Sequence, residues 1–169
     1  VAHGKLLLSG EYFVLDGAVA LAVPVRFGQS FHFMRDETST KLRWESRDPD
    51  ESIWFSAEYE IPSLRPLTCS DSETANTLAT LLAACRRQNP DFLQAAPGWR
   101  VLTRTDFPRA WALGTSSTLI AVLGRWAGVN PYQVLFETLG GSGYDIACAF
   151  AESAVLYQLL EKQQPIVTP

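Results

Sequence analysis

The apolar positions along the chain follow two periods, and the period changes partway through. Short apolar or alternating runs at 5–8, 18–25 and 29–34 are separated by glycine and proline, which predicts strands joined by turns. Apolar and polar residues then alternate from Ile53 to Ile61, which is the period of a strand. We therefore expect strands in the first part of the chain, the last of them antiparallel with one exposed face.

The helical period begins after residue 70. Ser70–Glu73 offers an N-cap and an acidic first turn, and the apolar spacing beyond it predicts a helix to about Arg87. The spacing of Leu119, Val122, Leu123 and Trp126 predicts a second helix that ends at Gly128. We expect strands at 99–107 and 153–160 and a shorter helix after Pro131. This order of elements indicates an α+β fold in two layers, with residues 1–169 as one domain.

Composition and charge narrow the functional class. The chain has 169 residues, of which 47% are hydrophobic and 19% charged, as in an ordinary soluble domain. A net charge of −4 offers no broad cationic surface, so we expect neither nucleic acid nor membrane as a partner. The cysteines at 69, 85 and 148 are too widely spaced for a zinc site, and we expect buried thiols in a cytoplasmic protein. The sequence leaves a homodimer open.

The most informative stretch is 108–118, between a predicted strand and an amphipathic helix. Small and hydroxyl residues gather at the start of that helix, Thr115 and Ser116 among them. The N–H groups of a first helical turn lack partners within the helix, so they can hold phosphate oxygens without a surrounding cluster of Lys and Arg. The alternative is that Thr115 or Ser116 is only an N-cap, and this stretch alone does not separate the two.

Two other segments carry candidate chemistry. Residues 1–12 place Lys5 and Glu11 around an apolar strand, and 140–147 is a glycine-rich turn that leads into Asp145. Taken alone, the lysine is more often a solvated strand residue and the aspartate a helix cap. The chain contains no G-x-x-x-x-G-K-[ST], no H-E-x-x-H and no complete G-x-G-x-x-G. Two histidines without a nucleophile elbow also disfavour a hydrolase.

Together, the three segments resemble the motifs of the GHMP kinases, in the same order. Ala2–Lys5 with Ser9–Tyr12 resembles A-P-G-K…G-E-H, Leu113–Ser117 resembles the G-L-G-S-S phosphate loop, and Ser142–Asp145 resembles S-G-x-D of mevalonate kinases. Gly-Tyr-Asp-Ile-Ala at 143–147 resembles a bacterial mevalonate-kinase-like group. The resemblance extends from Ala2 to about Leu160 and implies the fold of ribosomal protein S5 domain 2, with this chain as the N-terminal ATP- and substrate-binding domain.

The resemblance also implies a role for each matching residue. Asp145 would take or orient the proton of the acceptor hydroxyl, and Lys5 would lie between Asp145 and the γ-phosphate of ATP. Ser116 and Glu137 would hold Mg²⁺. The remaining positions would bind ATP (Leu113, Gly114, Thr115, Ser116, Ser117) or the acceptor (Glu11, Tyr12, Ser142, Gly143).

Several positions depart from the family pattern. His3 replaces Pro, Tyr12 replaces His, and Thr115 replaces Ser while keeping a hydroxyl. Ala112 replaces the first loop Gly and adds a Cβ where the backbone needs unusual dihedral angles. Family members also carry a C-terminal domain with a third glycine-rich motif, which nothing after Leu160 supplies, so we expect this chain alone to be weakly active or inactive.

The resemblance leaves the acceptor open. Mevalonate is the first candidate, and phosphomevalonate, homoserine and a sugar are the others. A different class of hypothesis is a catalytically weak relative that binds a nucleotide or metabolite. A third is an RNA-binding domain of the same fold, for which Arg100, Arg104 and Arg109 would have to form a basic face.

Overall fold

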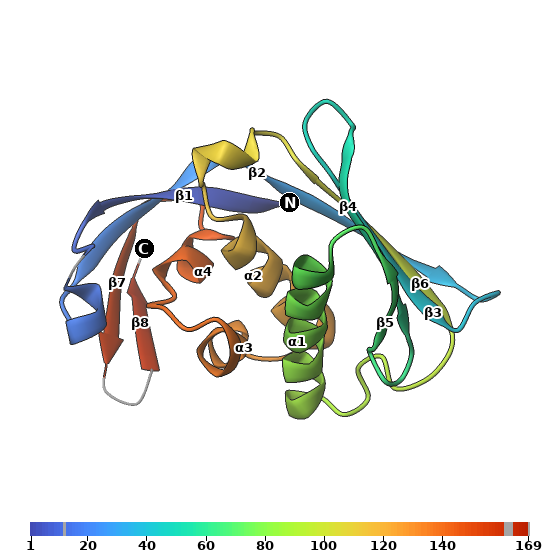
Figure 1. Ribbon diagram of the computed structural model, residues 1–169. Helices are drawn as coiled ribbons and strands as arrows, with labels where there is room; N and C mark the ends of the chain where they lie inside the picture. Colours follow the sequence, from blue (N-terminus) through green and yellow to red (C-terminus); the bar gives the residue numbers. More distant parts are fainter. Residues whose placement is uncertain (12, 161–163, 169) are drawn as a thin grey trace.

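The computed structural model describes residues 1–11, 13–160 and 164–168, and it consists of one sheet with helices on one side. Figure 1 shows the helices gathered beneath a curved sheet. The strands are β1 (Ala2–Ser9), β2 (Ala20–Asp36), β3 (Lys41–Arg47), β4 (Ile53–Glu60), β5 (Pro66–Cys69), β6 (Gly98–Thr105), β7 (Val155–Leu160) and β8 (Gln164–Thr168). The helices are α1 (Ser72–Gln88), α2 (Thr115–Ala127), α3 (Pro131–Thr138) and α4 (Tyr144–Cys148), with short 3-10 turns at Val14–Asp16 and Arg109–Trp111. The predicted two-layer α+β fold is confirmed.

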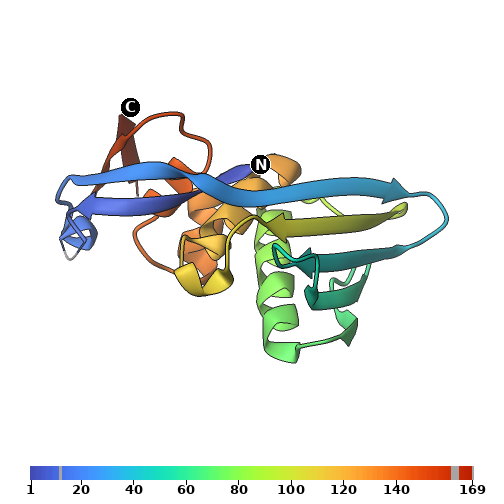
Figure 2. The same cartoon turned by 90° about the horizontal axis from the view of Figure 1, so that it is seen from above.

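Strand β2 organises the sheet. The strand order is β5-β4-β3-β6-β2-β7-β8, and β1 also pairs with β2. The first half of β2 pairs with β1 and β7, and its second half pairs with β6. Figure 2 shows β2 running along almost the whole sheet. The parallel pair of β3 and β6 brings residues far apart in the sequence side by side, for example Ser46 and Thr103.

The sequence-based break at Gly28 is wrong, because the two strands expected at 18–25 and 29–34 form the single strand β2. Gly28 pairs with His3 of β1. A Cβ at this position would lie 2.3 Å from the carbonyl oxygen of Ala2, a distance that no real Cβ contact has. The glycine is therefore needed for close backbone approach, not for a turn.

The helix boundaries agree with their sequence signals. Asp71 caps α1 by accepting a hydrogen bond from the backbone N–H of Thr74 at 2.7 Å, and Gly128 ends α2 in the left-handed conformation. Asn130 caps α3, which begins at Pro131. The sequence pattern predicted none of β3, β5, α4 and β8. Among the described residues, no helix has the length and apolar character needed to cross a lipid bilayer.

The core lies between the helices and the inner face of the sheet. Buried residues of β3, β4 and β6, such as Leu42, Phe55 and Val101, pack there against Leu81 and Leu82 of α1 and Leu123 of α2. The three cysteines are free thiols, of which those at 85 and 148 are buried as expected. The expectation of burial is wrong for Cys69, because it belongs to β5, the edge strand of the sheet.

Candidate active site

The side chains of Lys5 and Asp145 form an ion pair at the inner face of the sheet. Lys5 lies on β1, and its Nζ is 3.5 Å from Oδ2 of Asp145 in the first turn of α4. Both side chains are largely shielded, with 17% and 24% of their surface exposed. The ring of Tyr144 lies beneath Lys5, with Nζ 5.3 Å from the ring centroid. Two residues separated by most of the chain thus form one charged pair.

The environment keeps Lys5 charged. Burial on its own lowers the pKa of this amine, but the negative charge of Asp145 and the contact with Tyr144 outweigh burial. The pKa of Lys5 consequently lies above its ordinary value of 10.5. Burial and the neighbouring Asp145 also raise the pKa of the Tyr144 hydroxyl. At neutral pH the site therefore contains an ammonium group and a neutral phenol next to Asp145.

The start of α2 lies directly against this pair. The backbone N–H of Lys5 donates to the carbonyl oxygen of Leu113 at 3.1 Å. Gly114 is the N-cap with φ +93°, and a Cβ there would lie 3.4 Å from Cε of Lys5 and 3.7 Å from Oδ2 of Asp145. Gly114 has no side chain that could cap the helix. The first-turn N–H groups of α2 are therefore free to bind an anion next to the Lys5 ammonium.

The loop before α2 carries the expected strain. Ala112 has φ +52°, in the left-handed region where the family pattern places glycine. On the other side, Gly4 packs against the loop, since a Cβ at Gly4 would lie 2.9 Å from the Leu113 carbonyl oxygen. Ala112 therefore holds a backbone conformation that favours glycine.

A pocket of about 290 Å³ opens beside the start of α2. Thr115 and Ser116 line it from α2, and Glu73 and Thr77 line it from the first turns of α1. Its other walls include Trp54 and Leu139. The pocket therefore joins the two helix N-termini and offers both apolar walls and polar side chains.

Buried polar side chains of the sheet form the floor of this pocket. The Thr118 hydroxyl donates to Oε1 of Gln29 at 2.8 Å, and Nε2 of Gln29 donates to Oγ1 of Thr103 at 3.3 Å. Thr103 donates to Oγ of Ser46 at 3.0 Å, and the Trp44 indole N–H donates to the same oxygen at 3.1 Å. The network links α2 to three strands. Sequence reasoning missed these residues, although the alternation of Leu42, Trp44 and Ser46 with charged residues would have predicted β3.

The other expected site residues lie in different surroundings. Ser142 and Gly143 lead into α4, where the Tyr157 hydroxyl donates to the Ser142 carbonyl. Gly143 has φ +85°, and a Cβ there would lie 3.0 Å from the Tyr132 ring. Glu11 is exposed in the turn after β1, and Tyr12 lies outside the described residues.

Glu137 lies on α3, and its Oε2 pairs with Nη2 of Arg87 at 3.0 Å. Its part in metal binding stays a prediction. Within the described ranges, no group of three or more His, Cys, Asp or Glu side chains could hold a metal ion by itself. Mg²⁺ is commonly held by one or two protein oxygens together with phosphate oxygens and water. The exposed Ser116 hydroxyl at a helix N-terminus fits that mode of binding.

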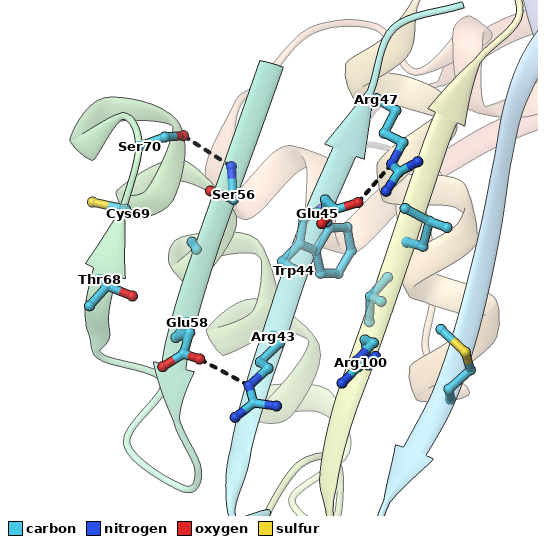
Figure 3. A pocket seen from close by; sticks show the side chains of 14 residues that line it. Arg43, Trp44, Glu45, Arg47, Ser56, Glu58, Thr68, Cys69, Ser70 and Arg100 are labelled. Carbon is cyan, nitrogen blue, oxygen red and sulfur yellow. Dashed lines mark hydrogen bonds and ion pairs between the residues drawn. The ribbon is translucent and has the colours of Figure 1, made fainter. Parts of the chain in front are cut away.

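A larger hollow, of about 700 Å³, lies on the helix-free face of the sheet. Figure 3 shows its charged side chains pairing with one another, as Arg43 does with Glu58 at 2.9 Å and Arg47 with Glu45 at 2.7 Å. None of the predicted site residues lines it. Of the three arginines considered for RNA binding, Arg104 pairs with Glu51 and Arg109 with Asp48. Arg100 lines the hollow without an ion pair among the described residues, so a single unpaired arginine of the three remains on this face.

Solved structures of kinases share this fold. A D-glycero-D-manno-heptose 1-phosphate kinase from Bacteroides thetaiotaomicron superposes with a TM-score of 0.72 at 18% identity, covering 99% of this chain and 58% of that chain. L. major mevalonate kinase in complex with R-mevalonate superposes with a TM-score of 0.69 at 16% identity, covering 99% of this chain and 50% of that chain. Streptococcus pneumoniae phosphomevalonate kinase in complex with phosphomevalonate and AMPPNP superposes with a TM-score of 0.62 at 20% identity, covering 93% of this chain and 48% of that chain.

This chain thus spans about half the length of these three kinases. No protein-family model matches the sequence, and no curated protein matches it. At such low identity the similarity establishes the fold and extends no further.

Proposed function

We propose that the chain is the ATP- and substrate-binding part of a kinase that transfers the γ-phosphate of ATP to a hydroxyl of a small molecule. The observation that carries the proposal is the Lys5–Asp145 pair beside the uncapped N-terminus of α2. Phosphoryl transfer needs a base near the attacking hydroxyl, a cation near the transferred group and donors for the phosphate oxygens. The Asp145 carboxylate, the Lys5 ammonium and the first-turn N–H groups of α2 lie close enough to serve these three needs. The structural neighbours that carry kinase names also support the assignment.

Each residue has a definite task in this proposal. The first-turn N–H groups of α2 and the hydroxyls of Thr115 and Ser116 bind the phosphates, and the adjoining pocket takes the nucleoside. Asp145 accepts the proton of the acceptor hydroxyl. Lys5 places its positive charge next to both the carboxylate and Gly114, where negative charge gathers during transfer. Bound Mg²⁺ would supply neutralisation of the phosphate charge.

The acceptor is a small hydroxyl compound. Mevalonate is the first candidate because 7–12 resembles the isoprenoid branch of the family. Phosphomevalonate, homoserine and a sugar are the alternatives, and the name of one structural neighbour adds a heptose phosphate. Because the chain spans about half of those kinases, we propose that full activity requires a further domain. Experiments therefore use the full-length protein.

Blocking the pocket tests nucleotide binding. Thr77 is an exposed residue of α1 that lines the pocket, so we expect Thr77→Trp to fill it and to raise the Kd for Mg-AMPPNP more than about tenfold, measured by calorimetry. Ser56→Trp is the matched control, because Ser56 lines the hollow on the opposite face of the sheet and should leave the Kd unchanged. The assignment fails if the wild-type protein binds no nucleotide or if only Ser56→Trp weakens binding.

Glu137 is proposed as a second oxygen ligand for Mg²⁺. Its present partner is Arg87 in a surface ion pair, and such pairs contribute at most about 1 kcal/mol, so the carboxylate is free to leave. We expect Glu137→Gln to raise the Mg²⁺ concentration that gives half-maximal turnover several-fold. Arg87→Ala is the control, since it removes the ion pair and keeps the carboxylate. If Glu137→Gln leaves the Mg²⁺ requirement unchanged, Glu137 is not a metal ligand and only pairs with Arg87 of α1.

A further inference from the structure

The three consecutive hydroxyls at the start of α2 do not point the same way. Thr115 and Ser116 line the nucleotide pocket, whereas Oγ of Ser117 donates to Oδ2 of Asp145 at 3.2 Å. Successive residues of an α-helix are turned by about 100° around its axis, which separates neighbouring side chains in this manner. The sequence resemblance had assigned Ser117 to the phosphates together with Ser116. The structure places its hydroxyl on the carboxylate instead.

Lys5 and Ser117 contact the same oxygen of the Asp145 carboxylate. Nζ of Lys5 is 3.5 Å from Oδ2, and the Ser117 hydroxyl donates to Oδ2. The Tyr144 hydroxyl is a further neighbour of this carboxylate. Among the side-chain hydrogen bonds and ion pairs with measured distances in the described parts of the chain, none reaches Oδ1. A carboxylate held through one oxygen keeps the lone pairs of its other oxygen available in a fixed direction.

We propose that Ser117 is a positioning residue that orients Asp145, so that Oδ1 faces the acceptor hydroxyl. The inference rests on the proposed kinase function. The acceptor oxygen forms a bond to the γ-phosphorus while its proton passes to Oδ1, and the bond from the γ-phosphorus to the bridging oxygen breaks to leave ADP with the electron pair. The Ser117 proton stays on its own oxygen throughout.

Lys5 cannot hold this orientation alone. Its ammonium is a rotatable point charge on a long side chain, and its contact with Oδ2 is longer than that of Ser117. The Ser117 oxygen is separated from the first turn of α2 by a single side-chain torsion, so it has far less freedom than the Lys5 ammonium. Loss of this hydroxyl should leave the carboxylate paired with Lys5 but free to rotate. A reacting group misplaced by about 1 Å costs about 100-fold in rate.

The kinetic test separates positioning from phosphate binding. In the full-length protein we expect Ser117→Ala to lower kcat about 10- to 100-fold and to leave the Kd for Mg-ATP within about twofold. Ser117→Thr keeps the hydroxyl and should restore most of the rate. Ser116→Ala is the contrasting variant and should weaken Mg-ATP binding. The proposal is overturned if Ser117→Ala weakens Mg-ATP as Ser116→Ala does, or if its kcat is unchanged.

A crystallographic comparison decides the same question without turnover. We expect the Asp145 carboxylate to keep one orientation, with Oδ2 on Ser117, in the wild type and in Ser117→Thr, and to adopt another or several in Ser117→Ala. An unchanged orientation in Ser117→Ala would refute the positioning role. A wild type that phosphorylates no acceptor would defeat the proposed function instead, and the orientation of Asp145 would still be determined independently.

Discussion

Asp145→Asn is expected to lower turnover about 1,000-fold or more while leaving the Kd for Mg-ATP within about threefold. The amide keeps the size of the side chain but cannot accept the acceptor proton. The substitution also removes the partner of Lys5, which lies 3.5 Å away, without adding bulk next to Gly114. Rates are compared with the acceptor at saturation, and Kd is measured by calorimetry on the same preparations.

The matched control for Asp145→Asn is Asp91→Asn. Asp91 is an exposed carboxylate in the loop after α1, so its loss changes the net charge equally and should leave kcat unchanged. If Asp145→Asn lowers turnover by only tenfold or less, Asp145 is not the base. A large loss of Mg-ATP affinity would instead assign it to nucleotide binding.

Lys5→Met should reduce kcat by about 100- to 10,000-fold, because it removes the positive charge from the position where phosphate charge develops. Methionine keeps an unbranched apolar stem, so packing against the Tyr144 ring is preserved. Lys5→Arg retains the charge but brings a planar group into a narrow space and should recover only part of the rate. In the double variant with Asp145→Asn the losses should combine less than additively, since the two side chains contact each other.

The raised pKa of Lys5 fixes the sign of the pH effect. Because its folded-state pKa lies above the unfolded value, the Lys5 ammonium stabilises the fold at neutral pH and up to the ordinary lysine value of 10.5. That contribution disappears as the pH rises through the folded-state pKa. We therefore expect no alkaline decline in kcat from Lys5 at neutral or moderately basic pH. A decline near pH 8 that disappears in Lys5→Arg would contradict this assignment.

The sequence predicted the helices better than the sheet. Helix α1 starts at a capping Asp71 and α2 ends at Gly128, and both signals are local. The continuity of β2 depends on how closely Ala2 approaches Gly28 from another strand, and no local pattern contains that information. Strand β3 was missed even though Leu42 and Trp44 alternate with charged residues, because only a short run carries the signal.

The candidate site residues were predicted through motif resemblance. How these residues are arranged in space depends on the fold and could not be predicted from the motifs. The spacing of Lys5 and Asp145 in the sequence says nothing about their 3.5 Å contact, which depends on β1, α2 and α4 packing together. The pocket floor unites Ser46, Thr103 and Gln29 through the pairing of β3 with β6 and of β6 with β2. The different directions of Ser116 and Ser117 likewise follow from helix rotation, which a motif of consecutive hydroxyls does not reveal.

The central claim is tested most directly by following the γ-phosphate. Full-length protein is incubated with Mg-ATP labelled at the γ-phosphorus and with mevalonate, phosphomevalonate, homoserine, galactose or a heptose phosphate in turn, alongside Asp145→Asn. The account predicts that one acceptor becomes labelled in equal amount to the ADP formed, and that the variant labels none. Label that stays in ATP with every acceptor, or that is transferred equally well by Asp145→Asn, would contradict it.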